Sequence, residues 1–289
     1  MFNATWEDMI SLNSHTEMMD EVLGPPRDYL GQDTGEVTWD RERISVDQAL
    51  ANDTAPLPTT EQREGYYGPN HFNYWASGLR DYCQLLEWLE PNNVARGKLL
   101  DIGCATGRLI RHVHAHTRAG FGEVIGCDIN RAHVDWIGRY LPLGIKVFQN
   151  TSIPALPLPD ASVDVVTAFS VFTHIECFDT TWLMELQRIL RPGGIAWLTI
   201  HGERIWRDIG PTWPLYASLT AHPEYCRHRS STRLPQERLV FRWYAERSYS
   251  AQVFYTETYI RRIWGRILAV RDVLPALPFF QDVVVLQKT

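Results

Sequence analysis

The stretch that decides the fold runs from Leu99 to Arg108 and reads LLDIGCATGR. Its apolar start predicts a buried strand over residues 98–102, and the glycines that follow predict a tight turn. Glycine suits such a turn because it lacks a Cβ, so the backbone can take a positive φ and approach a ligand closely. A helix is predicted to run from Arg108 towards Gly120. The stretch is therefore a strand, a turn and a helix in succession.

Strands and helices continue to alternate after this unit. The further predicted strands are residues 123–127, 145–148, 163–169, 194–200 and 281–288, and the predicted helices are residues 74–89, 131–140, 181–190 and 256–267. Such alternation predicts a doubly wound, mostly parallel α/β sheet. Ligands bind such sheets beyond the carboxyl ends of the strands, so functional residues are expected directly after each strand.

The composition indicates a globular chain with an apolar fraction of 45%. The start of the chain has no basic and apolar leader, and no apolar run approaches the roughly 20 residues that a membrane helix needs. The five cysteines are scattered without a CxxC pair, which argues against a disulfide framework and a zinc site. We therefore expect a cytoplasmic protein that does not cross a membrane.

The charge is unevenly distributed along the chain. Residues 1–64 carry 14 acidic and 4 basic side chains, a net charge of −10, so the remainder carries +4 of the total of −6. Because the chain is acidic overall and has no run of lysine or arginine, a nucleic acid is not an expected partner. We expect a small-molecule acceptor as the partner, and the sequence does not indicate an oligomeric state.

Four segments are predicted from the pattern. Residues 1–72 form an N-terminal extension, 73–202 a cofactor-binding core, 203–250 a cap inserted after the fifth strand, and 251–289 the C-terminal part of the core. The predicted cap interrupts the alternation and is rich in Trp, Tyr, Arg and Pro. An insertion at that point is expected to cover the strand ends on the acceptor side.

The stretch LLDIGCATGR resembles motif I of class I S-adenosylmethionine-dependent methyltransferases, which reads D-x-G-x-G-x-G. By this resemblance Asp101 anchors the turn and the ammonium group of the cofactor. Ala105 departs from the motif because it stands at the middle glycine. A nicotinamide site is the competing hypothesis, but Arg108 would occupy its third glycine position, where close packing favours glycine. A turn without a ligand is the other alternative.

Three more stretches resemble the same family. Residues 156–166 (LPLPDASVDVV) are similar to its LPFPDxSFDVV stretch, residues 190–194 (LRPGG) to its L-x-P-G-G turn, and residues 281–286 to its last strand. The resemblance implies a Rossmann-like sheet of seven strands with an antiparallel last strand. It also implies an enzyme that converts S-adenosylmethionine to S-adenosylhomocysteine. More loosely, SVFTH at 170–174 and REGYY at 63–67 resemble bacterial methyltransferases that modify sugars or secondary metabolites.

The expected cofactor site follows the first four strands. Asp128 ends the second strand about 20 residues past the turn, where a carboxylate can accept hydrogen bonds from both ribose hydroxyls. Capping of the helix that starts at Arg131 is a compatible alternative role. Asn150 or Ser152 would meet the adenine. The full set of expected cofactor residues is Asp101, Gly103, Cys104, Ala105, Gly107, Asp128, Ile129, Asn150, Thr151, Ser152, Phe169 and Ser170.

Two histidines are candidates for a catalytic base. His174 follows the fourth strand and His201 the fifth, and histidine titrates near neutral pH. A packed, structural histidine is the alternative for each. His112, His114 and His116 alternate along a predicted helix, so we expect that they do not share one face, that they are solvated, and that no metal is bound.

The predicted reaction is O-methylation of a hydroxyl of a sugar or secondary metabolite, as a step of small-molecule biosynthesis. N- or C-methylation and a non-catalytic, cofactor-binding regulatory subunit are the alternatives. Two features of the cap bear on the acceptor. Its six arginines (Arg227, Arg229, Arg233, Arg238, Arg242 and Arg247) either attract an anionic acceptor or pair with the acidic N-terminal extension. Its aromatic residues either stack on the acceptor or form a core of the cap itself.

Overall fold

The computed structural model describes residues 21–116, 120–243, 251–275 and 280–289. These residues divide into two compact units. The N-terminal unit holds the described residues up to 150, together with Val163–Val165. The C-terminal unit holds residues 151–162 and the described residues from Val166 onwards. The four segments expected from the sequence remain a prediction.

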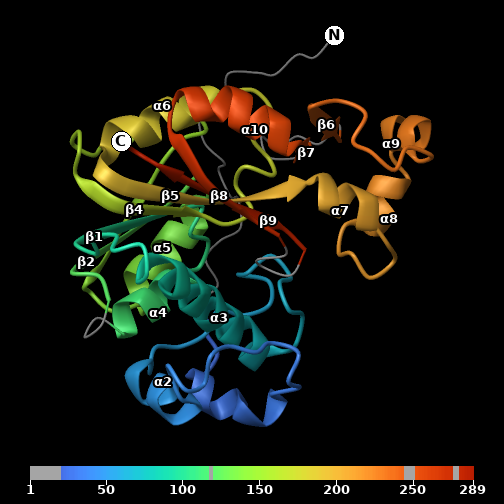
Figure 1. Cartoon of the computed structure of the whole chain (residues 1–289). Coiled ribbons are helices and arrows are strands. Elements are labelled where there is room, and N and C mark those ends of the chain that lie inside the picture. The colour runs from blue at the N-terminus through green and yellow to red at the C-terminus, as the bar shows by residue number, and fades with distance from the viewer. Residues whose placement is uncertain (1–20, 117–119, 244–250, 276–279) are drawn as a thin grey trace. The chain divides into compact units, whose positions relative to one another are not determined.

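The N-terminal unit contains a parallel sheet in the order β3-β2-β1, formed by β1 (Lys98–Ile102), β2 (Glu123–Asp128) and β3 (Ile145–Gln149). Helices α4 (Ile110–Ala115) and α5 (Arg131–Tyr140) follow β1 and β2. Before the strands come η1 (Pro26–Gln32), α2 (Val46–Asn52) and α3 (His71–Leu89), and the long α3 is prominent in Figure 1. The bounds of α5 agree with those expected from the sequence. The helix expected from Arg108 is shorter, because α4 starts at Ile110 after further turn residues.

Helix α3 starts three residues before its expected start at Tyr74. The side chain of Asn70 accepts the N–H of Asn73 at 3.0 Å and so caps the first turn. The apolar face of α3 includes Trp75 and Tyr82, both 0% exposed, and burial of each such side chain contributes about 1.5–3 kcal/mol. A Cβ on Gly78 would lie 2.0 Å from the carbonyl oxygen of Arg108. Glycine is therefore required where α3 meets the chain that follows β1.

The C-terminal unit has the strand order β4-β5-β7-β6, and β9 pairs antiparallel with both β5 and β8. Its strands are β4 (Val163–Ala168), whose first three residues belong to the N-terminal unit, β5 (Leu190–Gly202), β6 (Arg238–Arg242), β7 (Ala251–Tyr255), β8 (Ala269–Leu274) and β9 (Asp282–Gln287). Its helices are α6 (Asp179–Ile189), α7 (Glu203–Asp208), α8 (Tyr216–Thr220), α9 (Pro223–His228), α10 (Glu257–Ile263) and η3 (Trp264–Arg266).

The expected fold class is confirmed: the sheet is mostly parallel, and its last strand is antiparallel. The seven expected strands correspond to β1–β5, β8 and β9, and a hairpin extends the sheet to 9 strands within the described residues. The two additional strands are β6 and β7, which pair antiparallel with each other from Arg238–Tyr255 to Arg242–Ala251. Strand β7 also continues the sheet beside the end of β5, where His201 pairs with Phe254. Figure 1 shows this hairpin beside α7 and α8.

Strand β5 is longer than the expected residues 194–200. The N–H of Gly193 donates to the carbonyl of Lys288 at 2.7 Å, and the N–H of Lys288 donates to the carbonyl of Gly194 at 3.0 Å. The LRPGG stretch is thereby paired and becomes part of the strand. Throughout the described ranges, no helix is both long enough and apolar enough to cross a membrane.

Candidate cofactor and acceptor sites

The turn after β1 contains three residues with positive φ: Gly103 (68°), Ala105 (46°) and Gly107 (80°). The N–H groups of Gly103 and Cys104 both donate to the carbonyl oxygen of Cys127, at 2.8 and 3.1 Å, and so tie the turn to β2. A side chain in the left-handed conformation costs about 1–2 kcal/mol. The chain therefore keeps the glycine-type backbone at Ala105 and carries strain there.

Two glycines permit the close packing of this turn. A Cβ on Gly126 would lie 2.8 Å from the Sγ of Cys104, and a Cβ on Gly107 would lie 2.5 Å from a methyl group of Leu141. Burial raises the pKa of the Cys104 and Cys127 thiols well above the ordinary value. These two cysteines stay neutral and serve as packing residues rather than nucleophiles.

Asp128 lies at the end of β2 and orders the turn. Its Oδ2 accepts the N–H of Ala105 at 2.8 Å, and its Oδ1 accepts the N–H of Asn130 at 2.8 Å. An ionised carboxylate has about four acceptor positions, so about two remain for ribose hydroxyls. The cap of α5 is Asn130, whose side chain accepts the N–H of Ala132 at 3.0 Å. Asp128 is thus not the helix cap, and its geometry fits a ribose contact.

His133 is a neighbour of Asp128 that the sequence analysis missed. It is 6% exposed, its Nδ1 lies 3.6 Å from the Oδ1 of Asp128, and its Nε2 lies 3.8 Å from the Oε1 of Glu64. Burial alone would lower the pKa of this imidazole, but Asp128 and Glu64 raise it above the ordinary value overall. The sequence did contain a signal for this contact: His133 lies in the first turn of α5, shortly after Asp128 at the end of β2.

The remaining expected residues of the N-terminal unit lie on or next to β1 and β2. Asp101 is a buried residue of β1, 3% exposed. The N–H of Asn150 donates to the carbonyl of Asp128 at 3.1 Å, and the carbonyl of Ile129 accepts from the side chain of Gln149 at 3.0 Å. These two hydrogen bonds bring together the ends of β2 and β3, where the cofactor is expected.

The other expected cofactor residues belong to the C-terminal unit. Thr151 donates its hydroxyl to the carbonyl of Ile153 at 3.3 Å. The Oγ of Ser152 is buried and has no hydrogen-bond partner within the described residues. Phe169 and Ser170 start the loop of residues 169–178 between β4 and α6, called the β4–α6 loop below.

Ser170 has a φ of 58°, which is unusual for a residue with a side chain. Its N–H donates to the Oγ1 of Thr199 at 2.6 Å, and its hydroxyl accepts from the Nε2 of Gln281 at 2.8 Å. The carbonyl of Ser170 accepts from the Oγ1 of Thr173 at 2.8 Å. These contacts hold a strained backbone at the carboxyl end of β4, a position where such strain is typically found at functional sites.

His174 lies in the β4–α6 loop and is partly exposed. Its Nδ1 lies 2.7 Å from the carbonyl oxygen of Ala251, the first residue of β7. A carbonyl oxygen can only accept, so Nδ1 carries the proton, and in the neutral ring the lone pair is on Nε2. This tautomer is the one that a general base acting through Nε2 requires.

His201 lies at the end of β5 and is 2% exposed. Its Nε2 lies 2.9 Å from the Oε1 of Gln252, and its ring packs 5.4 Å from that of Trp213 and 5.1 Å from that of Phe254. Burial lowers the pKa of His201 to about 3, so the ring stays neutral. Its contacts are those of a packed histidine.

The aromatic residues of the cap form a core of their own. Trp213, Trp206 and Phe241 are buried together, and Tyr216 and Trp243 pack against them. Tyr255 is also buried, and its hydroxyl donates to the carbonyl of Phe172 at 3.1 Å. Tyr244 falls outside the described residues. Packing in a core of the cap therefore holds for Trp213, Tyr216 and Trp243, whereas Tyr255 lies outside that cluster.

The cap arginines are engaged within the C-terminal unit. Arg227 pairs with Glu224 at 2.9 Å and Arg242 with Glu176 at 2.7 Å. Arg238 donates to the carbonyls of Ile175 and Glu176. Arg229 and Arg233 are exposed, and Arg247 lies outside the described residues. The partners of Arg227, Arg238 and Arg242 belong to the cap, to the β4–α6 loop and, through Asp179, to α6.

The expectation that the histidines of α4 are solvated is wrong for two of them. His112 and His116 are 0% and 8% exposed, and their rings stack 6.5 Å apart, because residues four apart share a helix face. Burial lowers the pKa of both imidazoles, that of His112 to about 3. The Nε2 of His112 meets the carbonyl of Trp75 at 2.8 Å. Across the described residues, no group of three His, Cys, Asp or Glu side chains could hold a metal ion.

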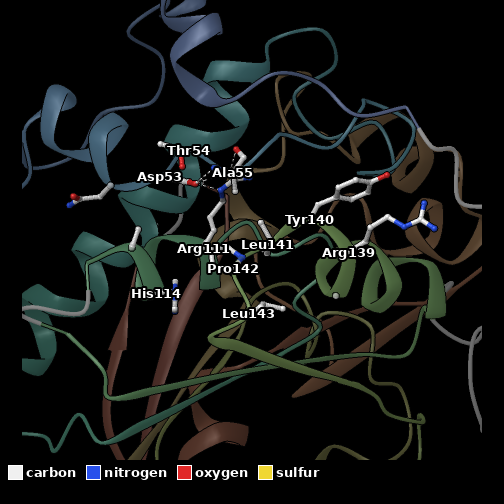
Figure 2. Close-up of a pocket in the computed structure, with 13 residues that line it drawn as sticks. Asp53, Thr54, Ala55, Arg111, His114, Arg139, Tyr140, Leu141, Pro142 and Leu143 are labelled. Carbon is white, nitrogen blue, oxygen red and sulfur yellow. Dashed lines mark hydrogen bonds and ion pairs between the residues drawn. The ribbon is translucent and has the colours of Figure 1, made fainter.

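Asp53 and Arg111 form a buried ion pair beside a cavity of about 360 Å³, drawn in Figure 2. The Nε of Arg111 donates to Asp53 at 2.6 Å, and the indole N–H of Trp75 donates to the same carboxylate at 2.8 Å. The dashed lines of Figure 2 join the carboxylate and the guanidinium, whereas Arg139 and Tyr140 lie apart from this pair. The pair connects Asp53, which directly follows α2, with Arg111 in α4. We interpret its role as structural. None of the expected cofactor or catalytic residues lines this cavity.

Known proteins similar to this chain are methyltransferases. A family model described as a methyltransferase domain matches residues 99–194. Residues 99–194 are therefore similar to a methyltransferase domain.

The relatives support the same domain. A probable S-adenosylmethionine-dependent methyltransferase of Mycolicibacterium smegmatis is 33% identical over 160 residues, which are 55% of this chain and 57% of that protein. A malonyl-[acyl-carrier protein] O-methyltransferase of Yersinia pestis is 30% identical over 154 residues, 48% of this chain and 54% of that protein. The chain therefore spans little more than half the length of these relatives. A solved SAM-dependent methyltransferase from Methanosarcina mazei is 16% identical with a TM-score of 0.48, over 69% of this chain and 96% of that one.

Proposed function

We propose that this chain transfers the methyl group of S-adenosylmethionine to a hydroxyl oxygen of a small-molecule acceptor, and that His174 removes the hydroxyl proton. The observation that carries the proposal is the 2.7 Å contact between the Nδ1 of His174 and the carbonyl of Ala251. It places a proton on Nδ1, so that the neutral imidazole has its lone pair on Nε2, which a hydroxyl acceptor requires and an amine arriving deprotonated does not.

The cofactor would be held by residues of the N-terminal unit. The positive-φ turn at Gly103, Ala105 and Gly107 supports a close backbone approach to the methionine portion, and Asp128 retains acceptor positions for the ribose. When bound, S-adenosylmethionine supplies an activated methyl group and leaves as S-adenosylhomocysteine. The residues of this chain then need only align the acceptor, exclude water and accept one proton. Alignment contributes up to about 7–11 kcal/mol in favourable cases.

His174 is preferred to His201 for this role. His201 is enclosed by aromatic rings and its Nε2 is occupied by Gln252, whereas His174 is partly exposed. Two relatives, from Yersinia pestis and Halorhodospira halophila, are named malonyl-[acyl-carrier protein] O-methyltransferases, and these names favour O-methylation over N- or C-methylation.

The test compares His174→Gln with His201→Gln. Pools of hydroxylated and amine-containing small molecules are incubated with methyl-labelled S-adenosylmethionine and the wild-type chain, and mass spectrometry identifies the methylated product. We expect His174→Gln to lower kcat by about 10²–10⁴-fold, because a general base contributes that much. His201→Gln should keep near-normal turnover, and calorimetry should show unchanged S-adenosylhomocysteine affinity for both variants.

Other results would overturn the proposal. Near-normal turnover by His174→Gln would mean that the acceptor needs no histidine base, as for an amine or a carboxylate. Binding of S-adenosylhomocysteine without turnover on any pool would indicate a regulatory subunit. Tighter binding of a nicotinamide cofactor would indicate an oxidoreductase.

A further inference from the structure

The hairpin of β6 and β7 contacts the β4–α6 loop at five successive residues. Three contacts come from β7: the hydroxyl of Tyr255 donates to the carbonyl of Phe172 at 3.1 Å, the N–H of Val253 donates to the carbonyl of Thr173 at 2.8 Å, and the Nδ1 of His174 donates to the carbonyl of Ala251 at 2.7 Å. Strand β7 thus runs along the loop and binds both its backbone and the histidine ring.

Strand β6 contacts the next two residues through arginine. The Nη2 of Arg238 donates to the carbonyls of Ile175 and Glu176, at 2.9 and 2.5 Å. Its guanidinium lies 5.7 Å from the centre of the Tyr255 ring, and only 19% of its side chain is exposed. Arg242 adds an ion pair with the Glu176 side chain at 2.7 Å. Since the loop is a series of turns and bends without regular hydrogen bonding up to α6, the hairpin supplies much of its support.

We propose that the β6–β7 hairpin positions His174 and selects its Nδ1–H tautomer, with Arg238 as the positioning residue. The hydrogen bond made by one imidazole nitrogen decides which nitrogen carries the proton. Arg238 fixes the loop immediately after His174 and stacks on Tyr255, so it keeps the ring in line with the Ala251 carbonyl. The role of Nε2 as proton acceptor rests on the proposed function, whereas the tautomer does not.

The first experiment needs no acceptor. The chain is labelled with ¹⁵N-histidine, and long-range ¹H–¹⁵N spectra are recorded at a pH at which the imidazoles are neutral. The His174 signals are assigned by their loss in His174→Gln. We expect the Nδ1–H tautomer in the wild type and a shift towards Nε2–H in Arg238→Gln. Exchange of the Val253 amide hydrogen should also become about tenfold faster, which corresponds to the loss of a hydrogen bond to a charged group.

Two further variants keep the test interpretable. Arg227→Gln is the matched control, because Arg227 is a cap arginine with 72% of its side chain exposed and pairs only locally with Glu224; it should change neither readout. If Arg238→Gln does not fold, Tyr255→Phe keeps the buried ring and removes the hydroxyl with its bonds to the carbonyls of Phe172 and Ile175, and it should shift both readouts in the same direction by less.

An unchanged tautomer and unchanged Val253 exchange in Arg238→Gln, or in Tyr255→Phe if the first variant is unfolded, would overturn the positioning role. The proposed function fails separately. If the tautomer shifts as expected while His174→Gln keeps normal turnover, the hairpin does position His174, and only the role of His174 as the base is wrong.

Discussion

The turn after β1 and the loop after β4 both follow a strand of the sheet, but they are stabilised over very different distances along the chain. The carboxylate of Asp128 holds the backbone of Ala105 from 23 residues away, whereas Ala251 holds His174 from 77 residues away. Closing the longer loop costs about 1 kcal/mol more in chain entropy. The turn after β1 is therefore held within one βαβ unit, whereas the loop that carries His174 contacts a hairpin far away in the sequence.

The largest expected effect on stability comes from breaking the Asp53–Arg111 ion pair, which joins residues 58 positions apart within the N-terminal unit. Asp53→Asn leaves the guanidinium of Arg111, with 1% of its side chain exposed, without a charge partner. We expect a loss of about 3–5 kcal/mol in the free energy of unfolding, measured with urea. Asp33→Asn is the control, because its pair with Arg41 is exposed and should cost less than about 1 kcal/mol. If the turn after β1 is held locally, folded Asp53→Asn keeps its S-adenosylhomocysteine affinity.

Acid should weaken the N-terminal unit through the same pair. Burial alone would raise the pKa of Asp53, but the charge and hydrogen bonds of Arg111 lower it from 3.8 to about 2. Because the folded-state pKa lies below the unfolded value, the stabilisation is fully present above the unfolded pKa and is lost as the pH falls towards the folded pKa. The urea midpoint of the wild type should therefore fall between about pH 4 and pH 2. An equally steep fall in Asp53→Asn would assign the acid sensitivity to other carboxylates.

Replacing Asp128 tests whether this carboxylate holds the turn after β1 and contributes to cofactor binding. Asp128→Ala removes the acceptor of the Ala105 N–H and the expected ribose contacts, each worth about 1.5–3 kcal/mol as charge-assisted hydrogen bonds. Calorimetry should show at least a tenfold loss of S-adenosylhomocysteine affinity. Asp135→Ala is the matched control, since Asp135 lies on α5 with 40% of its side chain exposed and pairs with Arg131. Unchanged affinity in Asp128→Ala would remove this residue from the cofactor site.

The smallest expected effect concerns the strain at Ala105. Its φ of 46° costs about 1–2 kcal/mol, and the greater unfolded-state freedom of glycine offsets about 0.5–1 kcal/mol of any gain. Ala105→Gly should therefore raise the free energy of unfolding by about 0.5–1 kcal/mol. Ala132→Gly, in the first turn of α5, should destabilise instead. Destabilisation by both substitutions would show that the Ala105 methyl group contributes packing that outweighs the strain.

The sequence predicted the local units well. The strand of residues 98–102, the helix of residues 131–140 and the positions of Gly103, Ala105 and Gly107 all appear as expected. These features depend on neighbours in the chain, because apolar periodicity and glycine placement act within a few residues. The carboxylate at the end of β2 was also located from its spacing alone.

The sequence analysis was weaker where partners are far apart in the chain. It did not locate β6, β7 or β8, whose pairing partners lie in the β6–β7 hairpin, at the end of β5 and in β9. It expected His112 and His116 to be solvated, although packing against α3 buries them. Nothing in the residue pattern distinguishes Arg238 from the other cap arginines.

The sequence by itself therefore determined the methyltransferase-type turn and the alternation of strands and helices, because these follow from local backbone preferences. Only the tertiary structure decided that His174 is partly exposed and that His201 is packed away. His174 and His201 have the same side chain and similar places after a strand. They differ because a carbonyl of β7 meets one ring and an aromatic cluster encloses the other.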